Sequence, residues 1–163
     1  MIFVTLGTQS PDFSRCLRML EELIDKYNIT DEVVAQIGHT KYTSTKIKLI
    51  DFVGEDEYRG LINKASIIIT HAGSGALFNS INYKKKVIAV ARLKKYSEMI
   101  DDHQLELVSK LSEMGYILDG TYSLESAWKK LETFNPKVDP LSCTITEGIE
   151  NYIALHEKQI ATK

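Results

Sequence analysis

The sequence has few of the features that mark secreted, metal-binding or nucleic-acid-binding proteins. Its 163 residues include only two cysteines, Cys16 and Cys143, which lie far apart and in no metal-ligand spacing, so a reducing cytoplasm is the simplest setting. Twenty basic residues face 22 acidic ones, and the net charge of −2 gives no overall attraction for DNA or RNA. No apolar run approaches the roughly 18 residues that span a bilayer. We therefore expect a soluble chain, or one held at a membrane by another molecule.

Several well-known ligand motifs are also missing. The sequence contains no G-x-G-x-x-G dinucleotide fingerprint, no Gly-Lys-Ser/Thr of a P-loop, and no Asp-x-Asp motif for a metal-bound sugar diphosphate. Its histidines, cysteines and aspartates form no cluster with metal-site spacing. We therefore expect neither a metal nor a cofactor.

The composition suits a globular protein, because 44% of the residues are hydrophobic and 26% are charged. No internal repeat, low-complexity tract or clear linker divides the chain, so we expect one domain over residues 1–163. Two prolines between residues 134 and 140 allow residues 134–163 to form a C-terminal helical extension.

Short apolar runs alternate along the chain with segments that have helical periodicity, the first of them starting at Asp12 as a helix N-cap. The expected strands are residues 2–6, 33–37, 47–53, 66–70, 86–91 and 116–118. The expected helices are residues 12–27, 55–64, 75–83, 101–114, 124–131 and 141–156. Strands that are nearly all apolar and alternate with helices indicate an α/β fold, a parallel sheet with helices on both faces.

One loop suggests a ligand. In residues 67–80, IIITHAGSGALFNS, an apolar strand ends in His-Ala-Gly-Ser-Gly and a helix follows. Ligands of open parallel sheets bind outside the carboxyl ends of the strands, and free amides at a helix N-terminus attract phosphate oxygens. Gly7-Thr8-Gln9 ends the first strand at the same edge, so the two loops together suggest a diphosphate. The alternative is that the glycines only make tight turns. For His71 we favour phosphate contact or helix capping over acid-base catalysis.

A second stretch, residues 91–107, ARLKKYSEMIDDHQLEL, leads from a strand through a polar loop into a helix. Asp101 or Asp102 is a candidate N-cap, and the alternative is that Gln104 and its neighbours bind the hydroxyls of a sugar. Arg92 and the lysines after it lie nearer the expected phosphate edge and could face a diphosphate, although a solvated loop is the simpler prediction.

Together, these motifs resemble a known family. "IFVTLGTQ", "THAGSGALFNSINYKKKVIAVAR" and "DDHQLEL" occur in the order and on the elements found in the nucleotide-sugar-binding C-terminal domain of glycosyltransferase family 28, and the resemblance covers about two thirds of the chain. The chain is most similar to small stand-alone members. These are the catalytic subunit of the eukaryotic two-component UDP-GlcNAc transferase on dolichol diphosphate, and bacterial exopolysaccharide or capsule transferase subunits. The bacterial pattern fits better, because it also has a glutamate before its Asn/Asp-His-Gln, as Glu98 is here.

The resemblance implies a Rossmann-like domain that is one half of a GT-B glycosyltransferase. It assigns a UDP-sugar site to Gly7, Thr8, Gln9, His71, Ala72, Gly73, Ser74, Gly75, Asn79, Glu98, Asp102, His103 and Gln104. In that assignment the loop at Gly73 binds the diphosphate, while His103 and Gln104 contact the donor sugar. Asn79 departs from the family, because larger members have a glutamate on the ribose there and an asparagine binds without charge assistance. The proline usual after the next strand is also replaced, by Ala91-Arg92.

The function that the resemblance implies is that of the donor-binding subunit of a split inverting glycosyltransferase. This enzyme would move a hexose or N-acetylhexosamine from a UDP-sugar to a sugar on polyprenyl diphosphate, in exopolysaccharide or capsule synthesis. A membrane-anchored partner subunit would bind the acceptor and hold the chain at the inner face of the membrane. The alternative is a non-catalytic, nucleotide-binding enhancer subunit of a partner transferase.

Overall fold

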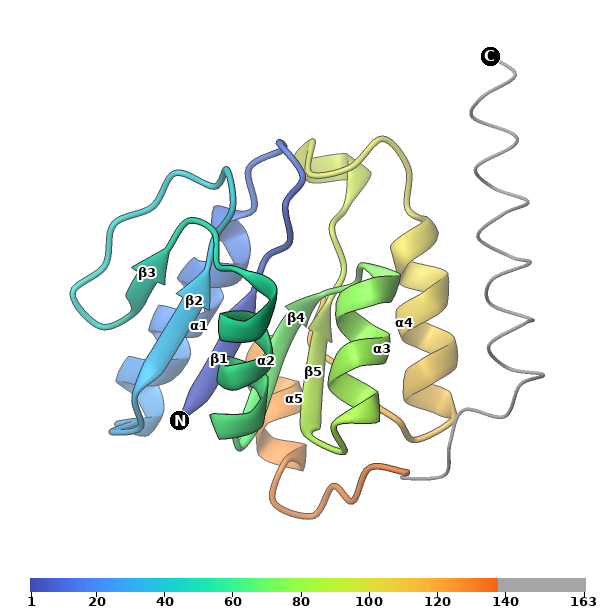
Figure 1. Ribbon diagram of the computed structural model, residues 1–163. Coiled ribbons are helices and arrows are strands. Elements are labelled where there is room, and N and C mark those ends of the chain that lie inside the picture. The colour runs from blue at the N-terminus through green and yellow to red at the C-terminus, as the bar shows by residue number, and fades with distance from the viewer. Residues whose placement is uncertain (138–163) are drawn as a thin grey trace.

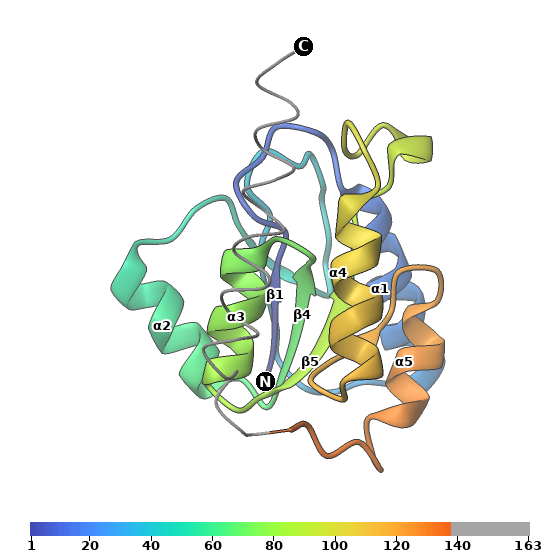
Figure 2. The same cartoon turned by 90° about the vertical axis from the view of Figure 1, so that its right-hand side faces the viewer.

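The computed structural model describes residues 1–137, which form a parallel six-stranded sheet between two layers of helices (Figures 1 and 2). The strand order is β3-β2-β1-β4-β5-β6. The strands are β1 (Ile2–Thr5), β2 (Val33–Gln36), β3 (Lys48–Ile50), β4 (Ile67–His71), β5 (Lys86–Val90) and β6 (Leu118–Asp119). The helices are α1 (Ser14–Tyr27), α2 (Glu55–Lys64), α3 (Ser74–Asn82), the 3-10 helix η1 (Lys94–Tyr96), α4 (His103–Glu113) and α5 (Leu124–Lys130).

Every strand and α-helix predicted within residues 1–137 is present, and the differences lie at the ends of the elements and in η1, which was not predicted. The third strand is only Lys48–Ile50, much shorter than the predicted 47–53. The N-cap position of α1 is Phe13, so the prediction of Asp12 was wrong by one residue; the Asp12 carboxylate instead accepts hydrogen bonds from the backbone N and the Oγ of Ser14, at 3.2 and 2.7 Å. The helix predicted at residues 141–156 lies outside the described residues.

The sheet has an apolar core on each face, as its uniformly apolar strands predicted. Successive side chains of a strand point to opposite faces, so Val4 packs with the residues of α1 and α5 while Phe3 packs with those of α2, α3 and α4. On the second face the rings of Phe3 and Tyr58 meet edge to face, with centroids 5.6 Å apart. Figure 2 shows the two helical layers on either side of the strands.

The strand order reverses direction at β1, which pairs with β2 on one side and with β4 on the other. The chain moves outward to β3 on the first side and to β6 on the second, so the β1–β4 pair is the topological switch point of the sheet. A crevice opens at such a point, beyond the carboxyl ends of the strands. That edge is the upper one in Figure 1, where the loop after β1 and the loop after β5 lie.

Candidate functional site

A pocket of about 550 Å³ lies at the switch point, over the carboxyl ends of β1, β2 and β4. It is lined by Thr5, Gly7, Thr8, Gln9, Gln36, Val53, Glu55, Tyr58, His71, Gly73, Ser74, Gly75, Ala76 and Asn79. The structure therefore brings together most of the residues predicted on the first-strand loop and the glycine loop. Ala72 alone among them is buried behind the pocket wall.

The two glycine turns make room for the imidazole of His71. A Cβ atom on Gly7 would lie 2.5 Å from Nε2 of His71, and one on Gly73 would lie closer still. Gly7 also has a φ of +77°, a conformation that side-chain-bearing residues rarely adopt. The glycines are therefore needed to pack this histidine between the two loops, whatever ligand approaches them.

His71 is held as a neutral hydrogen-bond acceptor toward the pocket. Its Nδ1 lies 3.2 Å from the carbonyl oxygen of Thr5, and because a carbonyl can only accept, Nδ1 carries the proton and Nε2 has a lone pair. Burial lowers the pKa of His71 to about 4, the bond to Thr5 partly opposes this, and the charge of Arg92 adds to it. An anion bound against Nε2 would favour protonation of the ring, which would turn this acceptor into a charged donor.

The N-terminus of α3 opens onto the same pocket. Gly73 is its N-cap residue, and no side chain caps the first turn, so the amides at Ser74, Gly75 and Ala76 are not satisfied by a capping group. These three residues line the pocket, and such an array of amides together with the helix dipole binds anions. Asn79 lies one turn further along α3 and lines the pocket as well.

Three further residues, Thr5, Gln36 and Tyr58, line the pocket on the α2 side of the sheet and were not predicted from the sequence as site residues. Gln36 is only 6% exposed, and within residues 1–137 its Oε1 has no hydrogen-bond partner. Burial raises the pKa of Tyr58, while a hydrogen bond with the Thr5 side chain lowers it. A polar residue at the end of an otherwise apolar strand, in VVAQ and IFVT, was the available signal.

The site residues predicted within residues 91–107 lie outside this pocket. Glu98 is 3% exposed, and its carboxylate accepts two hydrogen bonds from Arg15, at 2.8 and 2.9 Å, and a third from the backbone N of Leu93. Oε1 of the buried Gln104 accepts a hydrogen bond from the backbone N of Arg92, at 2.9 Å. Glu98 and Gln104 thus hold the chain after β5, and neither lines the pocket.

Asp102 and His103 stand at the start of α4. Asp102 is the N-cap residue, which confirms one of the two predicted candidates. Its side chain does not cap the helix; instead it accepts a hydrogen bond from the backbone N of Lys94. His103 pairs through Nδ1 with the carboxylate of Asp101. It lines a second, largely apolar hollow of about 710 Å³, which also contains Gln9 and therefore adjoins the first pocket.

Arg92 differs most from its prediction. It neither faces the pocket nor lies in a solvated loop: it is 1% exposed, and its guanidinium donates to the carbonyl oxygens of Leu6 and Pro11. Lys94 and Lys95 are exposed, as expected for a solvated loop. Nζ of Lys95 lies 4.8 Å from the ring centroid of Tyr96 and 5.0 Å from that of Tyr122.

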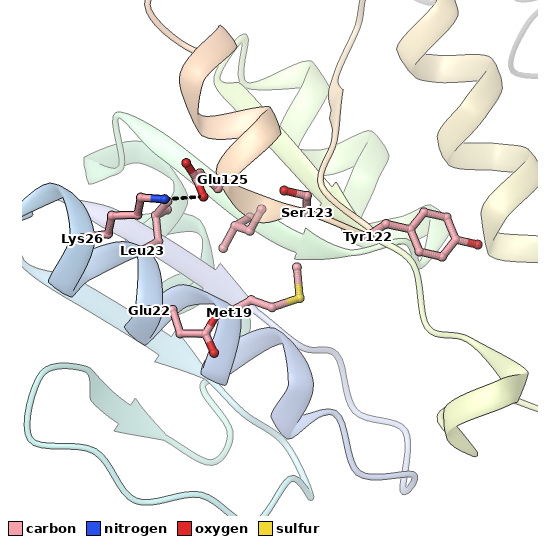
Figure 3. A pocket seen from close by; sticks show the side chains of 8 residues that line it. Met19, Glu22, Leu23, Lys26, Tyr122, Ser123 and Glu125 are labelled. Carbon is pink, nitrogen blue, oxygen red and sulfur yellow. Dashed lines mark hydrogen bonds and ion pairs between the residues drawn. The ribbon is translucent and has the colours of Figure 1, made fainter.

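A third hollow, of about 280 Å³, lies between α1 and α5 and contains none of the predicted site residues (Figure 3). Nζ of Lys26 and Oε2 of Glu125 are 2.9 Å apart across it. Hydrogen bonds from Lys129, Lys26 and Tyr27 lower the pKa of Glu125 to about 2. This ion-paired glutamate links the two helices that cover one face of the sheet.

Within residues 1–137 no three histidine, cysteine or acidic side chains are grouped so as to hold a metal ion. In the same part of the chain, no helix has the length and apolar character needed to cross a membrane.

A parallel sheet with its pocket at the switch point, next to an uncapped helix N-terminus, defines an α/β ligand-binding domain of the Rossmann-like class. The sequence profile of the glycosyltransferase family 28 C-terminal domain matches residues 1–148, so the chain belongs to this family.

The curated relatives that the chain matches are subunits of a UDP-N-acetylglucosamine transferase. Over 123 residues the chain is 26% identical to the human UDP-N-acetylglucosamine transferase subunit ALG13, a match that covers 71% of this chain and 10% of the relative. Over 92 residues it is 27% identical to the subunit of the same name from Candida glabrata, covering 56% of this chain and 37% of the relative. The chain thus spans well under half the length of these relatives.

Solved structures share the fold. An NMR structure of ALG13 superposes with a TM-score of 0.59 at 18% identity, covering 86% of this chain and 89% of that one. The glycosyltransferase SnogD from Streptomyces nogalater matches with a TM-score of 0.54 at 19% identity, covering 80% of this chain but 33% of that one. The six-stranded domain therefore corresponds to one half of a GT-B glycosyltransferase.

Proposed function

We propose that the chain binds a UDP-sugar in the 550 Å³ pocket and acts as the donor-binding subunit of a split inverting glycosyltransferase. The observation that carries the proposal is the meeting of the Gly7 loop, His71 and the N-terminus of α3 at the switch point of a family 28 domain. The enzyme would transfer a hexose or N-acetylhexosamine to a sugar on polyprenyl diphosphate, in exopolysaccharide or capsule synthesis.

In this proposal the diphosphate lies against the first turn of α3. The amides at Ser74, Gly75 and Ala76 and the helix dipole stabilise its charge, and they do so most strongly when UDP departs with an extra negative charge. Nε2 of His71 takes up a proton when the diphosphate binds and adds a charge-assisted hydrogen bond.

The ribose, the base and the sugar of the donor are assigned to the remaining residues of the pocket and the adjoining hollow. Asn79 binds the ribose hydroxyls, and the base lies toward Val53 and Tyr58, the pocket's apolar and aromatic wall. The sugar extends past Gln9 toward His103 in the adjoining hollow. Gln104 lines neither hollow and its Oε1 is bonded to the backbone N of Arg92, so it supports the sugar site by holding the chain after β5 instead of contacting the sugar.

A partner subunit supplies what this pocket lacks. An inverting transfer requires a base on the acceptor hydroxyl, on the sugar face opposite the departing diphosphate, and the polar groups described above all lie on the donor side. The partner would provide that base, the acceptor site and the anchor at the inner face of the membrane. Support comes from the relatives, which are named as subunits of a transferase.

The direct test is calorimetric titration of UDP and several UDP-sugars into the wild-type chain and two glycine variants. Gly73→Ala puts a methyl group onto the His71 ring and should abolish binding, whereas Gly60→Ala has open space around its new Cβ, is not among the lining residues and should bind like the wild type. Amide chemical shifts should move at Gly7 and Ser74 when UDP is added. Shifts confined to the amino edge of the sheet would refute the proposed site.

A non-catalytic enhancer subunit is the second candidate, and Asn79 favours it, because a neutral amide binds ribose more weakly than the family's glutamate. Turnover of a UDP-sugar by the chain combined with its partner separates the two functions. If Gly73→Ala loses UDP binding but leaves that turnover unchanged, the pocket is not the donor site of the enzyme, and this result favours the enhancer function.

A further inference from the structure

Arg92 follows β5, yet its side chain ends beneath the loop that follows β1. Nη2 donates to the carbonyl oxygen of Leu6 at 3.0 Å, and Nη1 donates to that of Pro11 at 2.7 Å. These two carbonyls stand on either side of residues 7–10, so the pocket loop with Gly7, Thr8 and Gln9 begins and ends on one guanidinium. No other residue in the described part of the chain donates a side-chain hydrogen bond to both ends of this loop.

The guanidinium is itself fixed from several sides. It lies over the ring of Phe13, with Cζ 4.7 Å from the ring centroid, and Nη1 is 3.4 Å from the carbonyl oxygen of Glu98. The backbone N of Arg92 donates to Oε1 of Gln104. The loop after β1 is therefore tied through Arg92 to both the loop after β5 and the first turn of α4.

Burying the charge of Arg92 in this arrangement lowers the stability of the folded protein. The residue is 1% exposed, its Nε has no partner within residues 1–137, and the Glu98 carboxylate is bonded to Arg15 instead. Buried charges without a bonded counter-ion are unfavourable, and apolar residues of similar volume often give equal or greater stability. The geometry therefore suits a residue that sets the conformation of a loop better than one that only stabilises the core.

We propose that Arg92 is a positioning residue of the donor pocket, which holds residues 7–10 in the conformation that lines it. The inference rests on the proposed nucleotide binding, but its effect on the loop exists without ligand. A lysine has one ammonium group and cannot reach the carbonyls of Leu6 and Pro11 with the same planar geometry. Arg92→Lys should therefore keep the charge and lose the clamp.

The experiment compares Arg92→Lys with Ile24→Val, a core change in α1 far from the pocket. We expect Arg92→Lys to bind UDP roughly tenfold more weakly, the scale of reordering a few loop residues on binding. Backbone NMR order parameters of residues 7–10 in the free protein should fall from the rigid range, about 0.85, toward the flexible range below about 0.6. Ile24→Val should change neither property. If Arg92→Lys does not fold, Phe13→Leu, which removes the ring beneath the guanidinium, should show the same two effects more weakly.

The outcomes separate the two proposals. Absence of UDP binding by the wild type would defeat the proposed function, while the order parameters of residues 7–10 would still test the clamp. Unchanged order parameters at residues 7–10 in Arg92→Lys would overturn the clamp. The clamp would also be overturned if Arg92→Lys and Ile24→Val had the same free energy of unfolding and lost the same UDP affinity. Arg92 would then act only through the stability of the fold.

Discussion

Removing the carboxylate of the buried Arg15–Glu98 pair should destabilise the domain strongly, and Glu98→Gln does this with almost no change of shape. The wild-type carboxylate accepts two hydrogen bonds from Arg15 and one from the backbone N of Leu93. Glutamine has one acceptor oxygen, and its NH₂ group would face a donor of the guanidinium. The variant therefore leaves the Arg15 charge largely buried and without its counter-ion.

The expected loss is about 3–5 kcal/mol of unfolding free energy, the usual result of removing one partner from a buried ion pair. In a chain of this length each kcal/mol lowers Tm by roughly 2–4 °C, so the melting temperature should fall by roughly 6–20 °C. Urea unfolding gives the free energy directly, provided that the transition is two-state and its slope is unchanged.

Glu132→Gln is the matched control, because Glu132 is an exposed glutamate. It should change the unfolding free energy by less than about 0.5 kcal/mol, as surface substitutions do. A Glu98→Gln variant within 1 kcal/mol of the control would refute the structural role that the contacts assign to Glu98.

The remaining predictions concern the pocket and the transfer reaction. Gln36→Leu removes a buried oxygen that lacks a hydrogen-bond partner within residues 1–137, so thermal melting should show equal or greater stability. Titration should show weaker UDP binding. A clear loss of stability would contradict this prediction. Because the pKa of His71 is lowered in the folded protein, the unfolded chain binds more protons than the folded one between pH 6.5 and about 4. The contribution of His71 to the unfolding free energy is therefore fully present above pH 6.5 and is lost as the pH falls through that window. Between pH 7 and pH 5 this histidine should account for up to about 2 kcal/mol, which His71→Gln should abolish; identical pH profiles of unfolding would refute the assignment. The chain alone should transfer no sugar to a lipid acceptor until its partner is added, and turnover of about 1 per second by the isolated chain would exclude the split enzyme.

Local patterns were sufficient to predict the fold. Runs such as IIIT and VIAV have no polar face, so they fit only strands covered on both sides, and the helices between them determine parallel pairing. The ends of elements were harder to predict, because β3 stops where pairing with β2 stops at Ile50, which depends on a neighbouring strand rather than on local composition.

The candidate site was predictable where a polar, glycine-containing loop directly follows an apolar strand. The loops at Gly7 and Gly73 both follow apolar strands, so the parallel sheet brings them to one edge. Gln36 required knowing that β2 is next to β1, with Gln36 opposite Thr5, and which face each side chain takes. Glu98 was assigned to the donor site by the family resemblance, and its bond to Arg15 could not be predicted because the two residues are 83 positions apart and no local pattern connects them.

The packing of His71 between Gly7 and Gly73 has a consequence for how this site varies among proteins. The imidazole fills the volume that a Cβ atom would need at either glycine, so the three positions form one steric unit. An alanine at position 73 is unfavourable beside histidine but should be tolerated beside a serine or alanine at position 71, and a double variant such as His71→Ala with Gly73→Ala should recover stability that Gly73→Ala alone loses. Such dependence predicts that residues 71 and 73 change together, with the single substitution as the disfavoured intermediate.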